Sequence, residues 1–158
     1  MSEFGLTNRY LEELLFPRTK YFKGVFSCDN IPIYPIRKPF TIIVNLSHEN
    51  EMGSHFISIF IARKKVIYFD SLGLPCINPH IKNYLRYYSS RNGRVKTVQN
   101  EMQFQCLNSF FCGYYCALFV LLMERGMTFK RFLNLFSKHC NENDSVVIDL
   151  LKYIFTLL

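Results

Sequence analysis

The stretch Gln105-Cys106-Leu107-Asn108-Ser109-Phe110-Phe111-Cys112-Gly113-Tyr114-Tyr115-Cys116 decides the fold expected of this chain. It places Cys112 in the first turn of a strongly apolar helix, predicted over residues 112–125. A thiol at a helix N-terminus lies at the positive end of the helix dipole, which favours the thiolate. Gly113 costs about 1 kcal/mol relative to alanine inside a helix, so it indicates a close backbone approach or a turn into the helix.

Two upstream residues, His55 and Asp70, are predicted to meet at one end of a hairpin. His55 opens an apolar strand over residues 55–62, and Asp70 closes a second strand over residues 66–70. The basic turn 63–65 joins the two strands. Both residues therefore lie far from the turn on neighbouring strands, which allows an imidazole–carboxylate hydrogen bond.

Together with Gln105 and Cys112, these residues supply the parts of a thiol-based catalytic site. A thiol nucleophile needs a base, the base needs an orienting carboxylate, and the developing oxyanion needs a hydrogen-bond donor. Gln105 lies seven residues before Cys112, so a short loop can fold its amide back over the helix start. We predict that His55, Asp70, Gln105 and Cys112 converge in one cleft.

Each of these residues also has a purely structural interpretation. A cysteine in an apolar helix is usually a small core residue, as we expect of Cys116, and His55 alone would be a satisfied core histidine. Asp70 begins good turn chemistry, and Gln105 could be an ordinary loop residue. The catalytic interpretation depends on the four occurring together.

Two other cysteine chemistries fit the spacing less well. A zinc site built from Cys106, Cys112, Cys116 and a histidine lacks any Cys-x-x-Cys pair, so we expect no metal. A redox dithiol of Cys112 and Cys116 would be one residue too long for the usual motif.

Composition indicates a globular protein with a basic surface. The chain has 158 residues, 49% of them hydrophobic, and a formal net charge of +7. We expect one domain over residues 1–158, with no signal segment and no membrane span, since the longest apolar run is shorter than the roughly 20 residues a bilayer requires. In a reducing compartment the six cysteines are expected to be thiols rather than disulfides. The positive charge is compatible with an anionic partner, or with an ordinary solvated basic face.

The periodicity along the chain predicts an α+β fold with a central, mostly antiparallel mixed sheet flanked by helices. The predicted strands are 21–27, 40–46, 55–62, 66–70 and 94–99. The predicted helices are 6–15, 78–88, 112–125 and 128–138, followed by a last helix capped by Asp144 or Ser145.

At these residues the chain resembles the adenovirus protease (adenain) family, including its relatives from Polinton (Maverick) elements and similar DNA viruses. The resemblance covers roughly residues 6–125 and includes a family cysteine segment that agrees in spacing from Gln105 to Cys116. The other matching segments are Tyr21-Phe22-Lys23-Gly24-Val25-Phe26 with Asp29 and Pro32, Ile43-Val44-Asn45, Gly53-Ser54-His55, and Tyr68-Phe69-Asp70-Ser71-Leu72-Gly73. One departure is Phe56, which stands where the family usually has tryptophan.

The resemblance implies a papain-like-clan cysteine endopeptidase with Cys112 as nucleophile, His55 as base, Asp70 as orienting carboxylate and Gln105 in the oxyanion hole. It implies cleavage of virion or capsid precursor proteins next to glycine during particle maturation, by a monomer in the host nucleus or virus factory and in the virion.

The resemblance also bears on activators. It implies no cofactor for the chemistry itself, and DNA as a possible activator. Candidate DNA contacts are Arg63, Lys64, Lys65, Arg86, Arg91, Arg94 and Lys96. Adenoviral members also bind an activating peptide through a disulfide, but the corresponding position is Arg94 here, so we do not expect a covalent peptide activator.

Two alternatives stay open from the sequence. The chain could be a deconjugase that acts on the C-terminal Gly-Gly of a ubiquitin-like or SUMO-type protein. It could also be a non-catalytic DNA-binding virion protein that kept the fold, although an idle site would have no chemical reason to hold all four residues.

Overall fold

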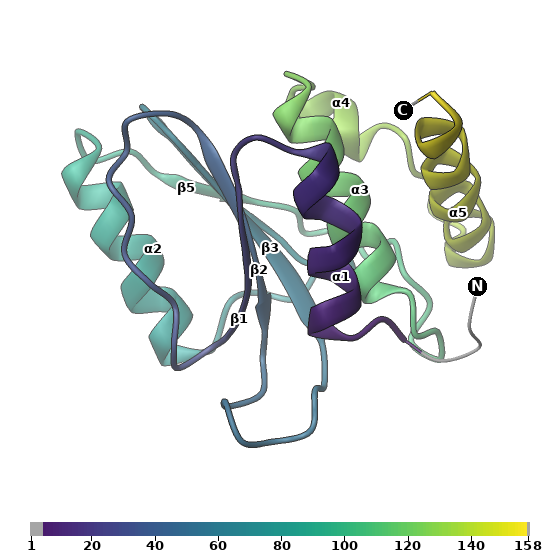
Figure 1. Ribbon diagram of the computed structural model, residues 1–158, viewed down its shortest axis with the longest axis horizontal. Helices are drawn as coiled ribbons and strands as arrows, with labels where there is room; N and C mark the ends of the chain where they lie inside the picture. The colour runs from purple at the N-terminus through teal and green to yellow at the C-terminus, as the bar shows by residue number, and fades with distance from the viewer. Residues whose placement is uncertain (1–4, 158) are drawn as a thin grey trace.

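A computed structural model describes residues 5–157 and shows a three-layer α+β architecture, with a central sheet between two helical layers (Figure 1). The five strands lie in the order β1-β2-β3-β4-β5, which is also their order along the chain. The strands are β1 (Phe22–Ser27), β2 (Phe40–Asn45), β3 (Phe56–Ala62), β4 (Lys65–Phe69) and β5 (Thr97–Gln99).

The sheet is mixed. The β2/β3 and β3/β4 pairings are antiparallel, whereas the outer pairings β1/β2 and β4/β5 are parallel. All six residues of β2 are buried, in agreement with its β-branched and apolar composition. In the hairpin, Ser58 pairs with Phe69, so the start of β3 and the end of β4 lie at the same end of the hairpin, away from its turn.

Helices cover both faces of the sheet. The helix α2 (Pro79–Arg91) packs on one face, while α1 (Asn8–Leu15), α3 (Cys112–Glu124), α4 (Phe129–Leu133) and α5 (Cys140–Thr156) form the layer on the other (Figure 1). A short 3-10 turn, η1 (Phe16–Arg18), follows α1. Helix α3 is the central one, and every residue from Gly113 to Leu121 is buried. Such a helix is apolar all round because it is enclosed on all sides.

The predicted class, a mixed sheet flanked by helices, is confirmed, and the main differences lie at the C-terminal end. The helix predicted over residues 128–138 ends at Leu133, and the last helix begins at Cys140 rather than at Asp144 or Ser145. Phe136 packs on Phe132 and Phe104, and Ser137 donates its backbone N–H to Asn143 Oδ1 at 2.8 Å. These tertiary contacts hold residues 134–139 in an irregular connection between α4 and α5. Because α5 begins at Cys140, Asp144 lies inside the helix and does not cap it.

The cysteines provide a second correction. Cys106 and Cys140 form a disulfide, so the expectation of six thiols is wrong for this pair. The two lie 34 residues apart in sequence with Cα atoms 4.9 Å apart, a proximity that only the tertiary structure creates. The remaining cysteines (Cys28, Cys76, Cys112 and Cys116) are free.

Within residues 5–157, none of the helices combines the length and apolar character that crossing a bilayer requires.

Candidate active site

Cys112 is the first residue of α3, where the sequence places it. Its thiol is free and half-buried. At this position the backbone N–H has no acceptor within the helix, and the helix dipole favours negative charge on the sulfur. A Cβ atom on Gly113 would lie 3.0 Å from Leu6 Cβ, so the glycine permits the close approach of the N-terminal segment. Cys116, one turn later, is fully buried, and burial raises the pKa of its thiol well above the usual value.

His55 and Asp70 meet at the end of the β3–β4 hairpin, as predicted. His55 directly precedes β3, and Asp70 directly follows β4. His55 Nε2 lies 2.7 Å from Asp70 Oδ1, and both side chains are largely buried. Asp70 Oδ1 also accepts the backbone N–H of Leu72 at 2.8 Å, which fixes the carboxylate. The histidine is therefore held in one orientation by a rigid partner.

The same histidine also contacts the sulfur. Because Nε2 is engaged by Asp70, Nδ1 is the nitrogen left for the hydrogen bond with Cys112. Burial lowers the pKa of His55, but the hydrogen bonds with Asp70 and Cys112 and the charges of these two groups outweigh it and raise the pKa to about 9. At neutral pH the imidazole of His55 is therefore protonated.

Gln105 is buried and its side-chain amide is held at both ends. Ser71 Oγ donates to Gln105 Oε1 at 2.6 Å, and Gln105 Nε2 donates to the carbonyl of Ser109 at 2.8 Å. The amide has two N–H bonds, so one of them is not needed for the bond to Ser109. Gln105 lines the same cleft as His55 and Cys112.

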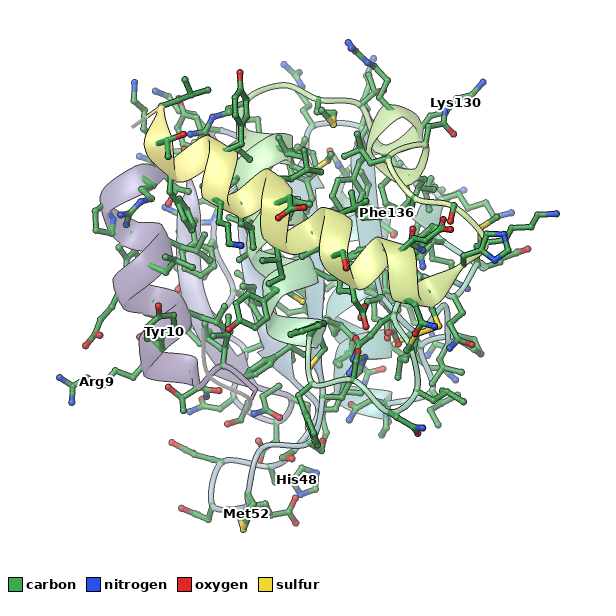
Figure 2. The ribbon with its side chains drawn as sticks, turned by 90° about the vertical axis from the view of Figure 1, so that its right-hand side faces the viewer. Arg9, Tyr10, His48, Met52, Lys130 and Phe136 are labelled. Carbon is green, nitrogen blue, oxygen red and sulfur yellow. A yellow bond between two sulfur atoms is a disulfide. The ribbon has the colours of Figure 1, made fainter. Side chains whose placement is uncertain are left out.

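The cleft that contains these groups has a volume of about 800 Å³. The loop between β2 and β3 forms one wall, and His48 and Met52 of this loop project from the body of the molecule (Figure 2). Leu107 and Phe110, on the opposite segment, are exposed apolar side chains. Cys112 lines this cleft with its thiol half-buried, so the sulfur is accessible from it.

Sequence analysis missed two residues that support the site. Asn100 Nδ2 donates to the carbonyl of Asp70 at 2.6 Å, and Asn100 Oδ1 accepts the Asp70 backbone N–H at 3.1 Å. The Ser71 hydroxyl orients the Gln105 amide, although the local sequence around Asp70 indicates only turn chemistry. The Asp-Ser pair was visible in sequence, but nothing local connects Asn100 to Asp70 across 30 positions.

The structure also bears on the metal alternative. Cys106 is bonded to Cys140, so it is not available to share a zinc ion with Cys112 and Cys116. No three His, Cys, Asp or Glu side chains in residues 5–157 are grouped so that they could hold a metal ion.

Comparison with known proteins identifies the fold. No family model and no curated protein matches the sequence. Among solved structures, the ASFV pS273R protease matches 90% of this chain and 65% of its own length, with a TM-score of 0.63 and 16% sequence identity. A selenomethionine form of that protease matches 67% of this chain and 41% of its own length, with a TM-score of 0.52 and 16% identity. ChlaDub1 from Chlamydia trachomatis matches 73% of this chain and 58% of its own, with a TM-score of 0.49 and 14% identity.

The chain thus shares its fold with the ASFV pS273R protease, and this fold is the predicted mixed sheet flanked by helices. The chain spans less than two thirds of the length of the pS273R protease chains that it matches.

Proposed function

We propose that this protein is a cysteine endopeptidase with Cys112 as its nucleophile. The observation that carries the proposal is the continuous chain from Asp70 through His55 to Cys112, with the thiol at a helix N-terminus and in an open cleft. A buried structural cysteine such as Cys116 has neither the imidazole nor the access. The fold shared with the ASFV pS273R protease is consistent with this chemistry.

In the proposed reaction, the Cys112 thiolate attacks the scissile carbonyl and a C–S bond forms as the carbonyl oxygen becomes an oxyanion. The Gln105 amide and the backbone N–H of Cys112 stabilise this oxyanion. His55 gives its proton to the leaving amine as the C–N bond breaks. Water, deprotonated by His55, then attacks the thioester, and the C–S bond breaks to release the acid.

The proposed substrates are virion or capsid precursor proteins cleaved next to glycine. Support comes from the sequence resemblance to the adenovirus protease family and from the fold shared with a protease of ASFV. The same grounds suggest action in a host nucleus or virus factory and in the virion.

DNA is proposed as an activator rather than as a participant in the chemistry. The seven basic side chains named above are all exposed, and none forms an ion pair with another residue in the described part of the chain, 5–157. Asn92, the residue that ends α2, links the basic turn 63–65 to this helix. Its side chain donates to Ala62 O at 2.5 Å and accepts the backbone N–H of Lys64 at 2.9 Å. The basic turn 63–65 therefore lies beside the end of α2.

Replacement of the nucleophile tests the proposal. We expect Cys112→Ala to abolish cleavage of a fluorogenic peptide with glycine before the scissile bond, and to leave the circular dichroism spectrum unchanged. Cys76→Ala is the matched control, since Cys76 is a free, half-buried thiol outside the site and burial raises its pKa. Iodoacetamide at neutral pH should label Cys112 first. Full activity of Cys112→Ala would refute the assignment.

The two alternatives are outcomes of the same assay. Hydrolysis of a ubiquitin-like protein with a C-terminal aminocoumarin, but not of the peptide, would identify a deconjugase. Absence of both activities, with an unreactive Cys112 and salt-sensitive DNA binding, would identify a non-catalytic DNA-binding protein.

A further inference from the structure

The C-terminal helix α5 is not part of the proposed catalytic machinery, yet its first turns contact the segment that carries Gln105. Asn143, which is 1% exposed, donates from Nδ2 to the carbonyl oxygen of Phe104 at 3.1 Å and to that of Ser137 at 2.9 Å. Figure 2 shows α5 lying across this side of the molecule, over α3. Asn143 thus binds the residue immediately before Gln105.

A second contact to the same carbonyl comes through α3. The Tyr115 hydroxyl, three residues after Cys112, lies 3.2 Å from Phe104 O and 2.8 Å from Asp144 Oδ1. Asp144 is also hydrogen-bonded by the backbone of Cys106. Asp144 therefore connects α5 to the helix of the nucleophile and to the Gln105 segment.

The N–H side of the Phe104–Gln105 peptide group is bound by the turn that follows Asp70. The carbonyl of Ser71 accepts the backbone N–H of Gln105 at 3.0 Å and that of Phe104 at 2.8 Å. Phe104 O and Gln105 N belong to one planar peptide group. That plane is bound on its N–H edge by the turn after Asp70, and on its C=O edge by Asn143. The Tyr115 hydroxyl also lies against this carbonyl, but it shares its single proton between Phe104 O and the nearer Asp144 Oδ1.

We propose that Asn143 and the Tyr115–Asp144 pair are positioning residues that fix the Phe104–Gln105 peptide plane and, through it, the Gln105 amide at the oxyanion. The inference rests on the proposed protease function. Rotation of this plane would move the Gln105 Cα and its side chain, whereas His55 and Cys112 are held by other elements. Loss of the contacts should therefore weaken oxyanion stabilisation and leave the thiol–imidazole pair intact.

Tyr115→Phe is the sharpest variant because it removes one hydroxyl and keeps the ring. We expect kcat on the peptide to fall by about 10-fold with KM little changed, since small displacements of a positioned group are costly in rate. The rate of Cys112 alkylation by iodoacetamide should not change, because alkylation forms no oxyanion. Asn143→Ala should behave in the same way.

The matched control is Tyr88→Phe. The Tyr88 hydroxyl is likewise bound to a carbonyl, donating to Tyr34 O at 2.8 Å, but in the core on the α2 side of the sheet. This variant should keep the wild-type kcat. In a Gln105→Ala background, Tyr115→Phe should cause little further loss, because both changes remove the same stabilisation. Fully additive losses, unchanged kcat in Tyr115→Phe, or equal loss of alkylation and turnover would overturn the proposal.

A readout without turnover separates this inference from the proposed function. Hydrogen exchange of the Phe104 and Gln105 backbone amides should quicken in Tyr115→Phe and Asn143→Ala and stay unchanged in Tyr88→Phe. If the wild type shows no hydrolysis and no reactive Cys112, the protease proposal fails whatever the exchange rates are. If the exchange rates of the two variants match the wild type, the positioning role fails even in an active enzyme.

Discussion

His55 gains its chemical character from two contacts on opposite sides of one ring. Asp70 binds Nε2, and the hydrogen bond with Cys112 falls to the other nitrogen. Although burial disfavours the charged ring, these contacts raise the pKa of His55 to about 9. The imidazole is thus charged at neutral pH and can donate a proton to a leaving amine.

The first prediction concerns pH. We expect the alkaline limb of kcat/KM near pH 9, where His55 loses its proton, and we expect Asp70→Asn to shift this limb to lower pH. Because the folded pKa lies above the ordinary 6.5, the stabilisation from charged His55 is complete below pH 6.5 and is lost as pH rises through 9. Thermal unfolding across this range reads the effect without substrate.

Asp149→Asn is the control for this prediction, because Asp149 is an exposed carboxylate on α5 whose partner is Lys152. It should leave both the rate profile and the stability profile unchanged. An alkaline limb that stays in place in Asp70→Asn would contradict the role assigned to this carboxylate.

The second prediction concerns Gly73, in the turn after Asp70. Its φ is +67°, and a Cβ atom would lie 2.6 Å from the Met102 carbonyl carbon and 2.8 Å from Gln103 N. Gly93 has a similar φ of +80° with nothing within 4 Å, so it isolates the conformational cost alone. We expect Gly93→Ala to cost about 1 kcal/mol of unfolding free energy. Gly73→Ala should cost about 2 kcal/mol more, because the backbone of the Gln105 segment must move.

Chemical denaturation of the two alanine variants measures this difference. Equal midpoints would show that the turn and the segment after Asn100 are not packed as closely as the structure indicates.

At the scale of elements, α5 and the Gln105 segment act as one unit. Besides the hydrogen bonds of Asn143 and Asp144, the disulfide Cys106–Cys140 joins the segment to the first residue of the helix. Helix α5 also contributes Val147 and Leu151 to the core beside α3. The last helix is therefore part of the support of the site rather than an appendage.

The third prediction follows from the position of this disulfide. A crosslink that closes a loop of 34 residues restricts the unfolded chain and should contribute about 3–4 kcal/mol to stability. A thiol reductant such as dithiothreitol should therefore lower the urea midpoint of the wild type, and Cys140→Ser should be less stable but insensitive to the reductant. Cys76→Ser should keep the sensitivity of the wild type, since Cys76 is free. A wild-type midpoint that does not respond to reductant would contradict this.

At the scale of the whole molecule, the candidate site and the basic turn lie at opposite ends of one hairpin. His55 precedes β3, and the turn 63–65 follows it, so seven strand residues, roughly 20 Å, separate them. An anion bound at the turn would leave the cleft open to a polypeptide. Activation by DNA would then require coupling through the sheet or attraction of substrate to the same polymer.

The fourth prediction tests this surface. We expect DNA affinity to fall with salt, with a slope of about 0.9 per phosphate contact in a double-logarithmic plot. Replacing Arg63, Lys64 and Lys65 with alanine removes up to three phosphate contacts and should reduce the slope by up to about 2.7. It should weaken binding to all DNA sequences equally. Arg9→Ala is the control, because Arg9 lies on α1 and pairs with Glu13. An unchanged slope in the triple variant would remove the turn from any DNA-binding surface.

The sequence alone determined most of the elements and indicated the four residues of the candidate site. Period-two and helical patterns located the buried strands and α3, and the element edges put His55, Asp70 and Cys112 at one end of the sheet. These are local properties, because periodicity and turn chemistry are written in neighbouring residues. The proposed catalytic roles remain predictions to be tested by mutation.

Only the tertiary structure decided what holds these residues in place. The Asn100 clamp on Asp70, the bond from Ser71 to Gln105, the disulfide and the Asn143 and Asp144 contacts all join residues 29 or more positions apart. Asp144, a plausible helix cap by its local sequence, instead accepts a hydrogen bond from Tyr115 in the interior. Such partners are selected by which buried polar groups meet when the layers pack, and no local pattern encodes that meeting.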